Sequence, residues 1–315
     1  MGPRIKHILI NFAYRLLRYS GLPYIFRELI QKNKVTILFF HDPDVKAAEQ
    51  AFAYLSEKYN FISLAQFLDA YMNKDGEQIP EKAMIITFDD GFMPNYNLLP
   101  VFKKYNVPAT IFLCAGITDT KRHHWFEENN SPIPFKRLIK MSDSERQEIL
   151  EESGFSREKE FENPRALTLS QINEMKEIVD FQSHTNFHPI LPTCTDEGAW
   201  NEIAGSKKTL ETKFGLKINA IAYPNGDYSE RDIQIARDAG YKCGLTVDYG
   251  FNDTTTDLFR LKRLCVNDTN NLDELIVKAT GAWDFFKIGN RSKQSGNHIK
   301  IKQQSSIIEA QKYAG

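Results

Sequence analysis

Cysteine, net charge and long apolar runs are all scarce in this chain of 315 residues. The cysteines form no Cys-x-x-Cys pair, so neither a disulfide framework nor a zinc knuckle is indicated; they are Cys114, Cys194, Cys243 and Cys265. A formal net charge of -1 provides no basic field for nucleic acid. No run approaches the roughly 18 apolar residues of a membrane span. No signal peptide is expected, because the stretch from Ile8 to Leu17 is interrupted by Asn11 and Arg15 without a small-residue cleavage site.

Residues 1–34 are basic and amphipathic. Apolar side chains recur at helical spacing from Ile5 to Leu16 and again from Leu22 to Ile30, with a break near Gly21. Only one acid, Glu28, stands among the basic residues Arg4, Lys6, Arg15, Arg18, Arg27, Lys32 and Lys34. We expect two basic amphipathic helices, which either lie on a membrane surface or pack outside the domain as an extra layer.

Strand and helix signals alternate from residue 35 onward, an order typical of a parallel sheet, open or closed into a barrel. The expected strands are residues 35–40, 83–88, 109–113, 179–182, 218–223, 242–247 and 261–266. We predict an α/β domain over residues 35–289 with a polar, partly helical insertion at about residues 117–167. The polar tail at residues 290–315 is expected to be disordered.

The stretch that organises the chain is residues 84–92, in which an apolar run stops at Asp89, Asp90 and Gly91. A buried parallel strand ends in this way when its carboxyl end carries a site. Adjacent residues on an extended chain point to opposite sides, so one carboxylate is expected to hold a metal while the other handles a proton. The alternative is a plain Asp-Asp-Gly turn between a strand and a helix.

Two histidines four residues apart, His184 and His188, follow the expected strand at residues 179–182. One helical turn or a tight loop would bring both imidazoles to a single metal. Together with a strand-terminal aspartate, they would leave open positions on zinc or another divalent metal for water and substrate.

The expected insertion contains three adjacent rings, His123, His124 and Trp125. Such rings could line a sugar subsite, since an aromatic face packs well on a pyranose ring. The alternative is a surface turn.

These motifs resemble those of the polysaccharide deacetylases, the NodB-homology or carbohydrate esterase 4 family. Residues 87–91, Thr-Phe-Asp-Asp-Gly, are similar to the family's first motif, and residues 184–188, His-Thr-Asn-Phe-His, to its second. The resemblance covers roughly residues 35–283. It implies a distorted (β/α) barrel in which Asp90, His184 and His188 bind the metal and Asp89 acts as general base.

The third motif departs from the family pattern, which usually reads Arg-x-Pro-Tyr-Gly. Ala222 stands in place of the arginine that would orient the base, and the sequence continues Tyr223, Pro224, Asn225 and Gly226. The resemblance still implies that Tyr223 and Pro224 contact substrate. The backbone N–H of Asn225 is the candidate for the oxyanion hole.

The late histidine that serves the family as general acid is also absent, since only His298, in the polar tail, follows His188. However, the expected strand at residues 35–40 resembles the circularly permuted members that deacetylate poly-N-acetylglucosamine, in which the acid lies on the first strand. The resemblance makes His41 the candidate acid. Otherwise, His41 is a hydrogen-bonded histidine at a strand end.

The resulting hypothesis is a hydrolase that removes an N-acetyl, formyl or O-acetyl group from a sugar in bacterial surface-polysaccharide or glycolipid biosynthesis. One divalent metal is expected, zinc before cobalt, nickel or iron. We predict a cytoplasmic protein at the inner face of the membrane, with a lipid- or nucleotide-linked substrate and no nucleic-acid partner. One rival is a non-catalytic glycan-binding or scaffold protein with the same fold. The other is a metal hydrolase of a bond such as a phosphodiester, for which the motifs provide no basic pocket.

Overall fold

The computed structural model describes residues 3–74, 76–127 and 131–285, so the tail predicted at residues 290–315 lies outside the described residues. Its centre is an eight-stranded sheet with the order β7-β6-β5-β4-β3-β1-β8, in which β2 also pairs with β3. All of these pairs are parallel. The strands are β1 (Val35–Phe40), β2 (Asn60–Phe61), β3 (Ala83–Phe88), β4 (Thr110–Leu113), β5 (Asp180–Ser183), β6 (Ala220–Ala222), β7 (Cys243–Leu245) and β8 (Leu264–Cys265).

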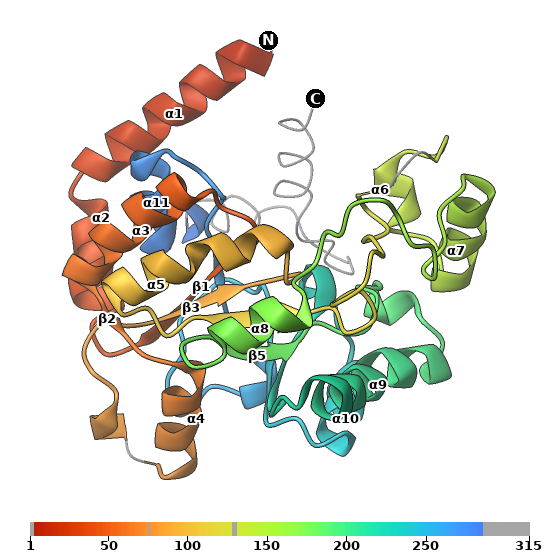
Figure 1. The fold of residues 1–315 in the computed structure, drawn as a ribbon. Helices are drawn as coiled ribbons and strands as arrows, with labels where there is room; N and C mark the ends of the chain where they lie inside the picture. Colours follow the sequence, from red (N-terminus) through yellow and green to blue (C-terminus); the bar gives the residue numbers. More distant parts are fainter. Residues whose placement is uncertain (1–2, 75, 128–130, 286–315) are drawn as a thin grey trace.

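Helices surround the sheet (Figure 1). The α-helices are α1 (Pro3–Tyr19), α2 (Leu22–Ile25), α3 (Val45–Lys58), α4 (Leu64–Met72), α5 (Leu99–Tyr105), α6 (Phe135–Leu138), α7 (Asp143–Glu152), α8 (Leu169–Met175), α9 (Asp196–Phe214), α10 (Glu230–Asp238) and α11 (Leu272–Ala279). Several of these helices begin at capping boxes, including α7 at Ser142 and α8 at Thr168. Among the described residues, no helix combines the length and the apolar character that crossing a membrane requires.

A short segment, residues 261–265, joins the two edges of the sheet. Leu261 forms a parallel bridge with Leu245 of β7. Three residues later, Leu264 pairs with Leu38 of β1. Because one segment pairs with both β7 and β1, the sheet curls into a distorted barrel. This confirms the predicted fold class.

The strands are buried on both faces, which explains why they read as continuous apolar runs. Alternate residues of β1 and β3 belong to two different clusters. The barrel interior contains Val35, Ile37, Ala83, Ile85, Phe112, Ala220, Ala222, Cys243 and Leu245. The intervening residues pack outward against the helices, as Leu38, Phe40, Met84, Ile86 and Phe88 do.

Two segments lie outside the barrel. The N-terminal helices α1 and α2 are separated at Gly21, whose φ of 82° favours glycine. Figure 1 shows α1 extending beyond the body of the molecule, with α6 and α7 at the opposite side. Helices α6 and α7 belong to the predicted insertion, which has a small core of its own around Trp125, Leu150 and Phe155. The domain boundaries given above stay a prediction.

Gly244 of β7 is a sensitive packing position, because a Cβ atom there would lie 2.7 Å from Cζ of Tyr223. Tyr223 is fully buried and its hydroxyl donates to the carbonyl of Phe259, so the ring has no room to move away. We expect Gly244→Ala to lower the free energy of unfolding by about 1–3 kcal/mol, the usual cost of overpacking, as measured by urea denaturation. The control is Gly76→Ala, where the nearest side-chain atoms lie 4.0 Å away. Equal stability of both variants would contradict the prediction.

Candidate metal centre and active site

The two adjacent aspartates follow β3 and are both buried. The N–H of Asp89 donates to the carbonyl of Phe40 at the end of β1, which continues the pairing of the two strands. Asp90 and Gly91 then adopt left-handed φ values of 69° and 65°. This turn sends the carboxylates in different directions, Asp89 toward Arg263 and Asp90 toward His184. The two carboxylates therefore occupy separate positions with different partners, while their division into metal ligand and base stays a prediction.

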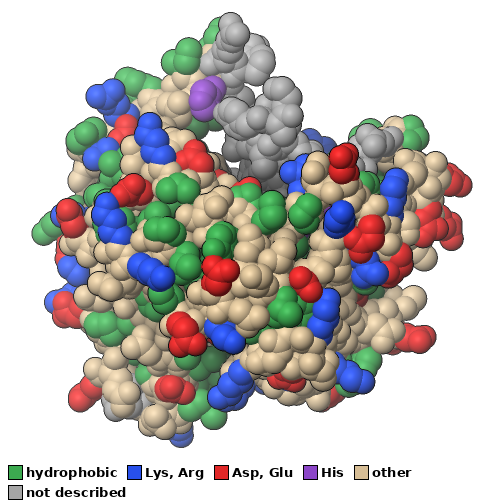
Figure 2. Space-filling model, viewed as in Figure 1, with side chains coloured by type: hydrophobic (Ala, Val, Ile, Leu, Met, Phe, Trp, Pro, Cys, Tyr) green, Lys and Arg blue, Asp and Glu red, His purple; other side chains and the backbone are tan. Residues whose placement is uncertain are grey.

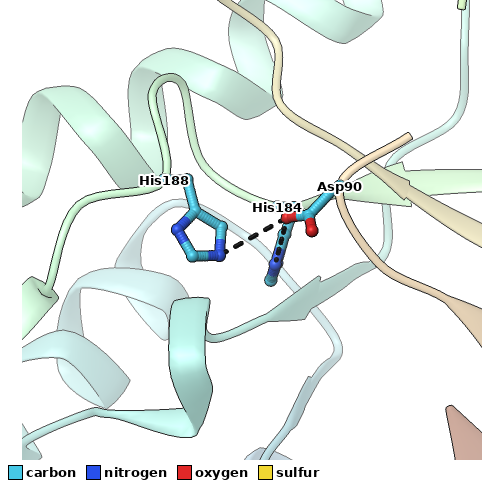
Figure 3. A group of neighbouring side chains, drawn as sticks. All are labelled: Asp90, His184 and His188. Carbon is cyan, nitrogen blue, oxygen red and sulfur yellow. Dashed lines mark ion pairs between the residues drawn. The ribbon is translucent and has the colours of Figure 1, made fainter. Parts of the chain in front are cut away.

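The two histidines follow β5 and converge on Asp90 (Figure 3). Nε2 of His184 lies 3.5 Å from Oδ1 of Asp90, and Nε2 of His188 lies 3.4 Å from the same atom. Nδ1 of His184 is 2.8 Å from the carbonyl oxygen of Ala222 in β6. If Nδ1 carries the proton and donates it to this carbonyl, the lone pair of Nε2 faces Asp90.

The loop between the histidines is hydrogen-bonded to Glu202 of α9. The N–H groups of Asn186 and Phe187 both donate to Oε2 of Glu202, at 2.9 Å each. Within the loop, Thr185 and His188 have left-handed φ values of 68° and 55°. A tight loop, one of the two geometries that the spacing of four allows, therefore brings the imidazoles together.

The group Asp90, His184 and His188 fits a divalent metal, because its three donor atoms lie within 4.8 Å of one another. Oδ1 of Asp90 is buried and has no hydrogen-bond partner among the described residues. Two ligands each about 2.0–2.1 Å from a tetrahedral zinc are separated by about 3.4 Å. The two N···O separations match that spacing and exceed an ordinary hydrogen bond.

Burial also favours the neutral imidazoles that a metal requires. Desolvation lowers the pKa of His184, although the charges of Asp89 and Asp90 oppose the shift. Desolvation, followed by the neighbouring His184 and His124, lowers the pKa of His188 well below its usual range. Both rings therefore offer a lone pair at neutral pH.

Asp89 has an arginine partner that the sequence motifs did not reveal. The buried side chain of Arg263 forms a bidentate pair with it, NH1 at 2.7 Å from Oδ1 and NH2 at 2.8 Å from Oδ2. The conclusion that the base lacks an orienting arginine is therefore wrong. Ala222 does replace the motif arginine, but Arg263, in the segment that closes the barrel, points its guanidinium at the same carboxylate.

This pair keeps Asp89 ionised. Burial alone would raise the pKa of Asp89, but the charge and the hydrogen bonds of Arg263 bring it below its usual value. A buried carboxylate held in this way is available to accept a proton at neutral pH.

His41 lies at the end of β1, where its backbone is fixed by two elements. The N–H groups of His41 and Asp42 donate to the carboxylate of Asp268, each at 3.1 Å. Nδ2 of Asn95 donates to the carbonyl of His41. The imidazole is 27% exposed, and its Nδ1 lies 4.0 Å from Oδ2 of Asp268. His41 thus combines a fixed backbone, an accessible ring and a nearby carboxylate.

The turn after β6 places the remaining predicted residues differently. Tyr223 and Pro224 are buried, and Tyr223 packs against Tyr228 at 5.0 Å between ring centroids. Their side chains therefore support the barrel, and the prediction that they contact substrate is not supported. Asn225 is partly exposed with a φ of 55°. The hydrogen bonds of this turn use the N–H groups of the two following residues and not that of Asn225.

The prediction that Trp125 lines a sugar subsite is also corrected, because its side chain is buried against the loop that carries His188. Its indole is 2% exposed, and its N–H donates to the carbonyl of His188 at 2.9 Å. Phe135 stacks on the ring and the guanidinium of Arg146 lies 5.1 Å from its centroid. His123 and His124 are buried too, so the alternative of a surface turn is equally wrong.

His124 and Cys114 approach the same centre from another side, a role that the sequence analysis missed. One donor atom from each lies within 4.8 Å of a carboxylate oxygen of Asp90. Nδ1 of His124 is 3.0 Å from Oε2 of Glu127, whereas Nε2 has no hydrogen-bond partner among the described residues. Burial raises the pKa of Cys114 well above its usual range, which makes it a weaker ligand than the imidazoles.

The arrangement is that of a parallel barrel which holds a candidate metal-binding group beside an ionised, arginine-bound carboxylate. The sequence model of the polysaccharide deacetylase family matches residues 76–244. The chain therefore belongs to the polysaccharide deacetylase family, as the first two motifs indicate.

Two curated relatives illustrate the similarity. YxkH of Bacillus subtilis, which bears a polysaccharide deacetylase name, is 29% identical over 189 residues, or 59% of this chain and 52% of YxkH. Poly-beta-1,6-N-acetyl-D-glucosamine N-deacetylase of Staphylococcus epidermidis is 25% identical over 237 residues, or 72% of this chain and 66% of that protein. The chain thus spans about half to two thirds of the length of these relatives.

Solved structures share the fold. The Streptococcus pyogenes deacetylase PplD, in complex with acetate, has a TM-score of 0.56 and 25% identity, and covers 77% of this chain and 98% of its own. IcaB from Ammonifex degensii has a TM-score of 0.58 at 19% identity, and covers 79% of this chain and 98% of its own.

Removing one partner of the buried pair is expected to cost more stability than removing both. Arg263→Met leaves the carboxylate of Asp89 buried and unpaired, so we expect a loss of about 3–5 kcal/mol in the free energy of unfolding. The double variant Asp89→Asn with Arg263→Met should regain a large part of this loss. Urea denaturation of the four proteins of the cycle measures both. A double variant no more stable than Arg263→Met would refute the coupling.

The pair also predicts a pH dependence. The folded protein lowers the pKa of Asp89, so the stability that the pair contributes is fully present above the unfolded value, about 3.9. It is lost as the pH falls below that value. We expect wild type to lose stability on acidification more steeply than the double variant, measured by urea denaturation between about pH 6 and 3. Parallel curves would contradict this expectation.

Proposed function

We propose that this protein is a metal-dependent deacetylase that removes an N-acetyl group from a sugar of a bacterial surface polysaccharide or glycolipid. The observation that carries the proposal is the convergence of Asp90, His184 and His188 beside the pair of Asp89 and Arg263. Family membership and the activity in the name of the Staphylococcus epidermidis relative support the substrate class. A formyl or O-acetyl group would use the same chemistry.

In this proposal Asp90, His184 and His188 hold one divalent metal, zinc before cobalt, nickel or iron. Bound there, the ion supplies Lewis-acid polarisation of the acyl carbonyl and lowers the pKa of water. The neutral rings of both histidines and the unpartnered Oδ1 of Asp90 support this assignment.

The chain's own residues then divide the proton transfers. Water adds to the acyl carbon while the carboxylate of Asp89 takes its proton, and the N–H of Asn225 stabilises the developing oxyanion. Breaking the C–N bond needs a proton on the departing nitrogen, which His41 donates. Acetate and a free amine are the products, and Arg263 keeps the base in position throughout.

The proposed substrate is lipid- or nucleotide-linked, and the proposed location is the cytoplasmic side of the membrane. Support for a membrane-bound substrate comes from the N-terminal helices, whose outer face is apolar and is described below. The rival hypothesis of a non-catalytic glycan-binding protein rested on the missing motif arginine and on the absence of the late histidine. Arg263 removes the first of these supports, because Asp89 has its partner.

We expect about one equivalent of zinc, or of another divalent metal, in the purified protein. Asp90→Asn and His184→Ala should each lose the metal, since either change removes one of three ligands, and should release no acetate from N-acetylglucosamine oligomers. Metal content by mass spectrometry checks the first outcome and acetate assay the second.

The matched control for the histidine variant is His7→Ala, on the exposed side of α1. It should keep both metal and activity. Wild-type protein that binds no metal after reconstitution would overturn the proposal, and a protein that binds metal but deacetylates nothing would favour the glycan-binding rival.

Substitution of His41 is expected to lower kcat more for a substrate with a poor leaving group than for one with a good leaving group. For an amide the departing nitrogen must be protonated, so His41→Gln should lower kcat by about 10²–10⁴-fold on N-acetylglucosamine oligomers. With p-nitrophenyl acetate, whose leaving group departs without a proton, the loss should be less than about tenfold. Equal losses on both substrates would assign His41 another role.

A further inference from the structure

Helix α1 has two apolar faces, and only one of them is covered. The inner face packs on the C-terminal part of the chain, where Tyr14 is 4% exposed and its ring centroid lies 4.4 Å from that of Trp283. Asn271, which caps α11, donates from its side chain to Asn11. Arg18 pairs with Asp273 in the first turn of α11. These contacts fix the rotation of α1 about its own axis.

The outer face of α1 exposes large hydrophobic side chains at helical spacing. They are Ile5 (54% exposed), Ile8 (66%), Leu9 (51%), Phe12 (58%), Leu16 (58%) and Tyr19 (71%). Steps of three and four residues place all of these on one side of the helix, opposite Tyr14. We call these six residues the outer face.

The exposed apolar surface continues into the next two short helices. α2 and the following π-helical turn, Phe26–Ile30, expose Tyr24, Ile25, Leu29 and Ile30. Elsewhere in the described chain the exposed large hydrophobic residues are Val45, Met72, Trp200 and Phe285. Figure 2 shows hydrophobic side chains at the surface where α1 projects in Figure 1, with basic side chains beside them. The apolar surface is therefore concentrated at one end of the molecule.

Among the described residues of α1 and α2, the charge that is left without an ion-pair partner beside this surface is positive. Arg15 is exposed beside the outer face and forms no ion pair with any described residue. Glu28, the single acid of residues 1–34, is already paired with Arg27 and Lys82. The guanidinium groups of Arg18 and Arg27 lie close to the rings of Tyr19 and Tyr24, at 5.2 and 5.6 Å.

We propose that the outer face binds the surface of an anionic lipid bilayer, with α1 lying parallel to the membrane plane. An apolar stripe flanked by arginine and tyrosine fits the headgroup region, where apolar side chains insert and basic ones meet lipid phosphate. The charge argues against a second copy of the chain as the occupant. Two such faces would bring Arg15 of one copy close to Arg15 of the other, and Arg15 forms no ion pair with any described residue.

The position of α1 links this surface to the rim of the barrel. Asn271, which contacts Asn11, is three residues from Asp268, which holds the backbone of His41. The lipid-binding face and the candidate acid are thus attached to the same short segment between β8 and α11. A substrate carried by the membrane would reach the site on this side of the molecule. The lipid contact itself does not depend on the proposed deacetylase function.

The test is flotation of the full-length protein with vesicles. We expect wild type to float with vesicles of 70% phosphatidylcholine and 30% phosphatidylglycerol, and to do so much less with pure phosphatidylcholine or at high salt. The variant Leu9→Ser, Phe12→Ser, Leu16→Ser should lose at least about tenfold in bound fraction, because the inserted apolar area is removed. These side chains are exposed, so the fold should be unaffected, as thermal unfolding can verify.

The matched control removes exposed hydrophobic residues elsewhere. Val45→Ser, Met72→Ser, Trp200→Ser should float as wild type does. Equal flotation of the two triple variants, or no flotation of wild type, would overturn the proposal. A wild-type dimer in lipid-free solution that the first triple variant abolishes would also overturn it, since a second copy would then cover the face. Acetate release from a soluble substrate should be unchanged in both variants, which separates this result from the proposed function.

Discussion

The buried ion pair between Asp89 and Arg263 connects the closure of the barrel with the chemistry of its site. Arg263 lies in the segment that pairs with both edge strands, while Asp89 follows β3 near the middle of the sheet. The arginine also donates from Nε to the carbonyl of Thr246, and its guanidinium lies 4.4 Å from the ring centroid of Phe39. Because these contacts require the closed barrel, the orientation of the candidate base depends on closure of the sheet.

The neighbouring aspartate has the opposite character. Both carboxylate oxygens of Asp89 accept hydrogen bonds from the guanidinium of Arg263. In contrast, Oδ1 of Asp90 and Nδ1 of His188 are buried without hydrogen-bond partners in the described chain. Burying a polar atom without a partner normally costs stability. A bound cation would offset this cost, because it would give the buried oxygen and the two neutral imidazoles a common partner. This contrast between two adjacent residues is what distinguishes the candidate base, Asp89, from the candidate metal ligand, Asp90.

Local patterns in the sequence predicted the framework closely. The expected strands at residues 35–40 and 83–88 are β1 and β3, because buried parallel strands read as uninterrupted apolar runs. The candidate metal-binding group could also be predicted from the sequence, since its members follow β3 and β5 and the carboxyl ends of parallel strands meet at one rim. Arg263 could not be predicted in this way. It is 174 residues from Asp89 in sequence, and it lies just before β8, whereas the position of the motif arginine, Ala222, is in β6.

The roles of Trp125, His124 and Tyr223 were missed for a related reason. Each was assigned from its residue type and its place beside a motif, but burial depends on how the insertion and the turn after β6 fold onto the barrel. Trp125 is buried because the insertion packs against the loop of His188, to whose carbonyl its indole donates. Arg146 from α7 lies over the same ring. Contacts between segments far apart in the chain leave no local pattern that a single sequence could reveal.

Helix α1 shows how structure can resolve an ambiguity that periodicity leaves open. A helix with apolar residues on two opposite sides is compatible both with packing on the domain and with binding to a membrane. The structure packs one side on the domain and leaves the other exposed, because Tyr14 contacts Trp283 while Phe12 and Leu16 face outward. An isolated amphipathic helix would be free to rotate and to bury the larger face. Here the contacts of Asn11 and Arg18 with the start of α11 hold the rotation. The outer face is therefore presented by the folded domain itself, in a fixed relation to the rim that carries His41.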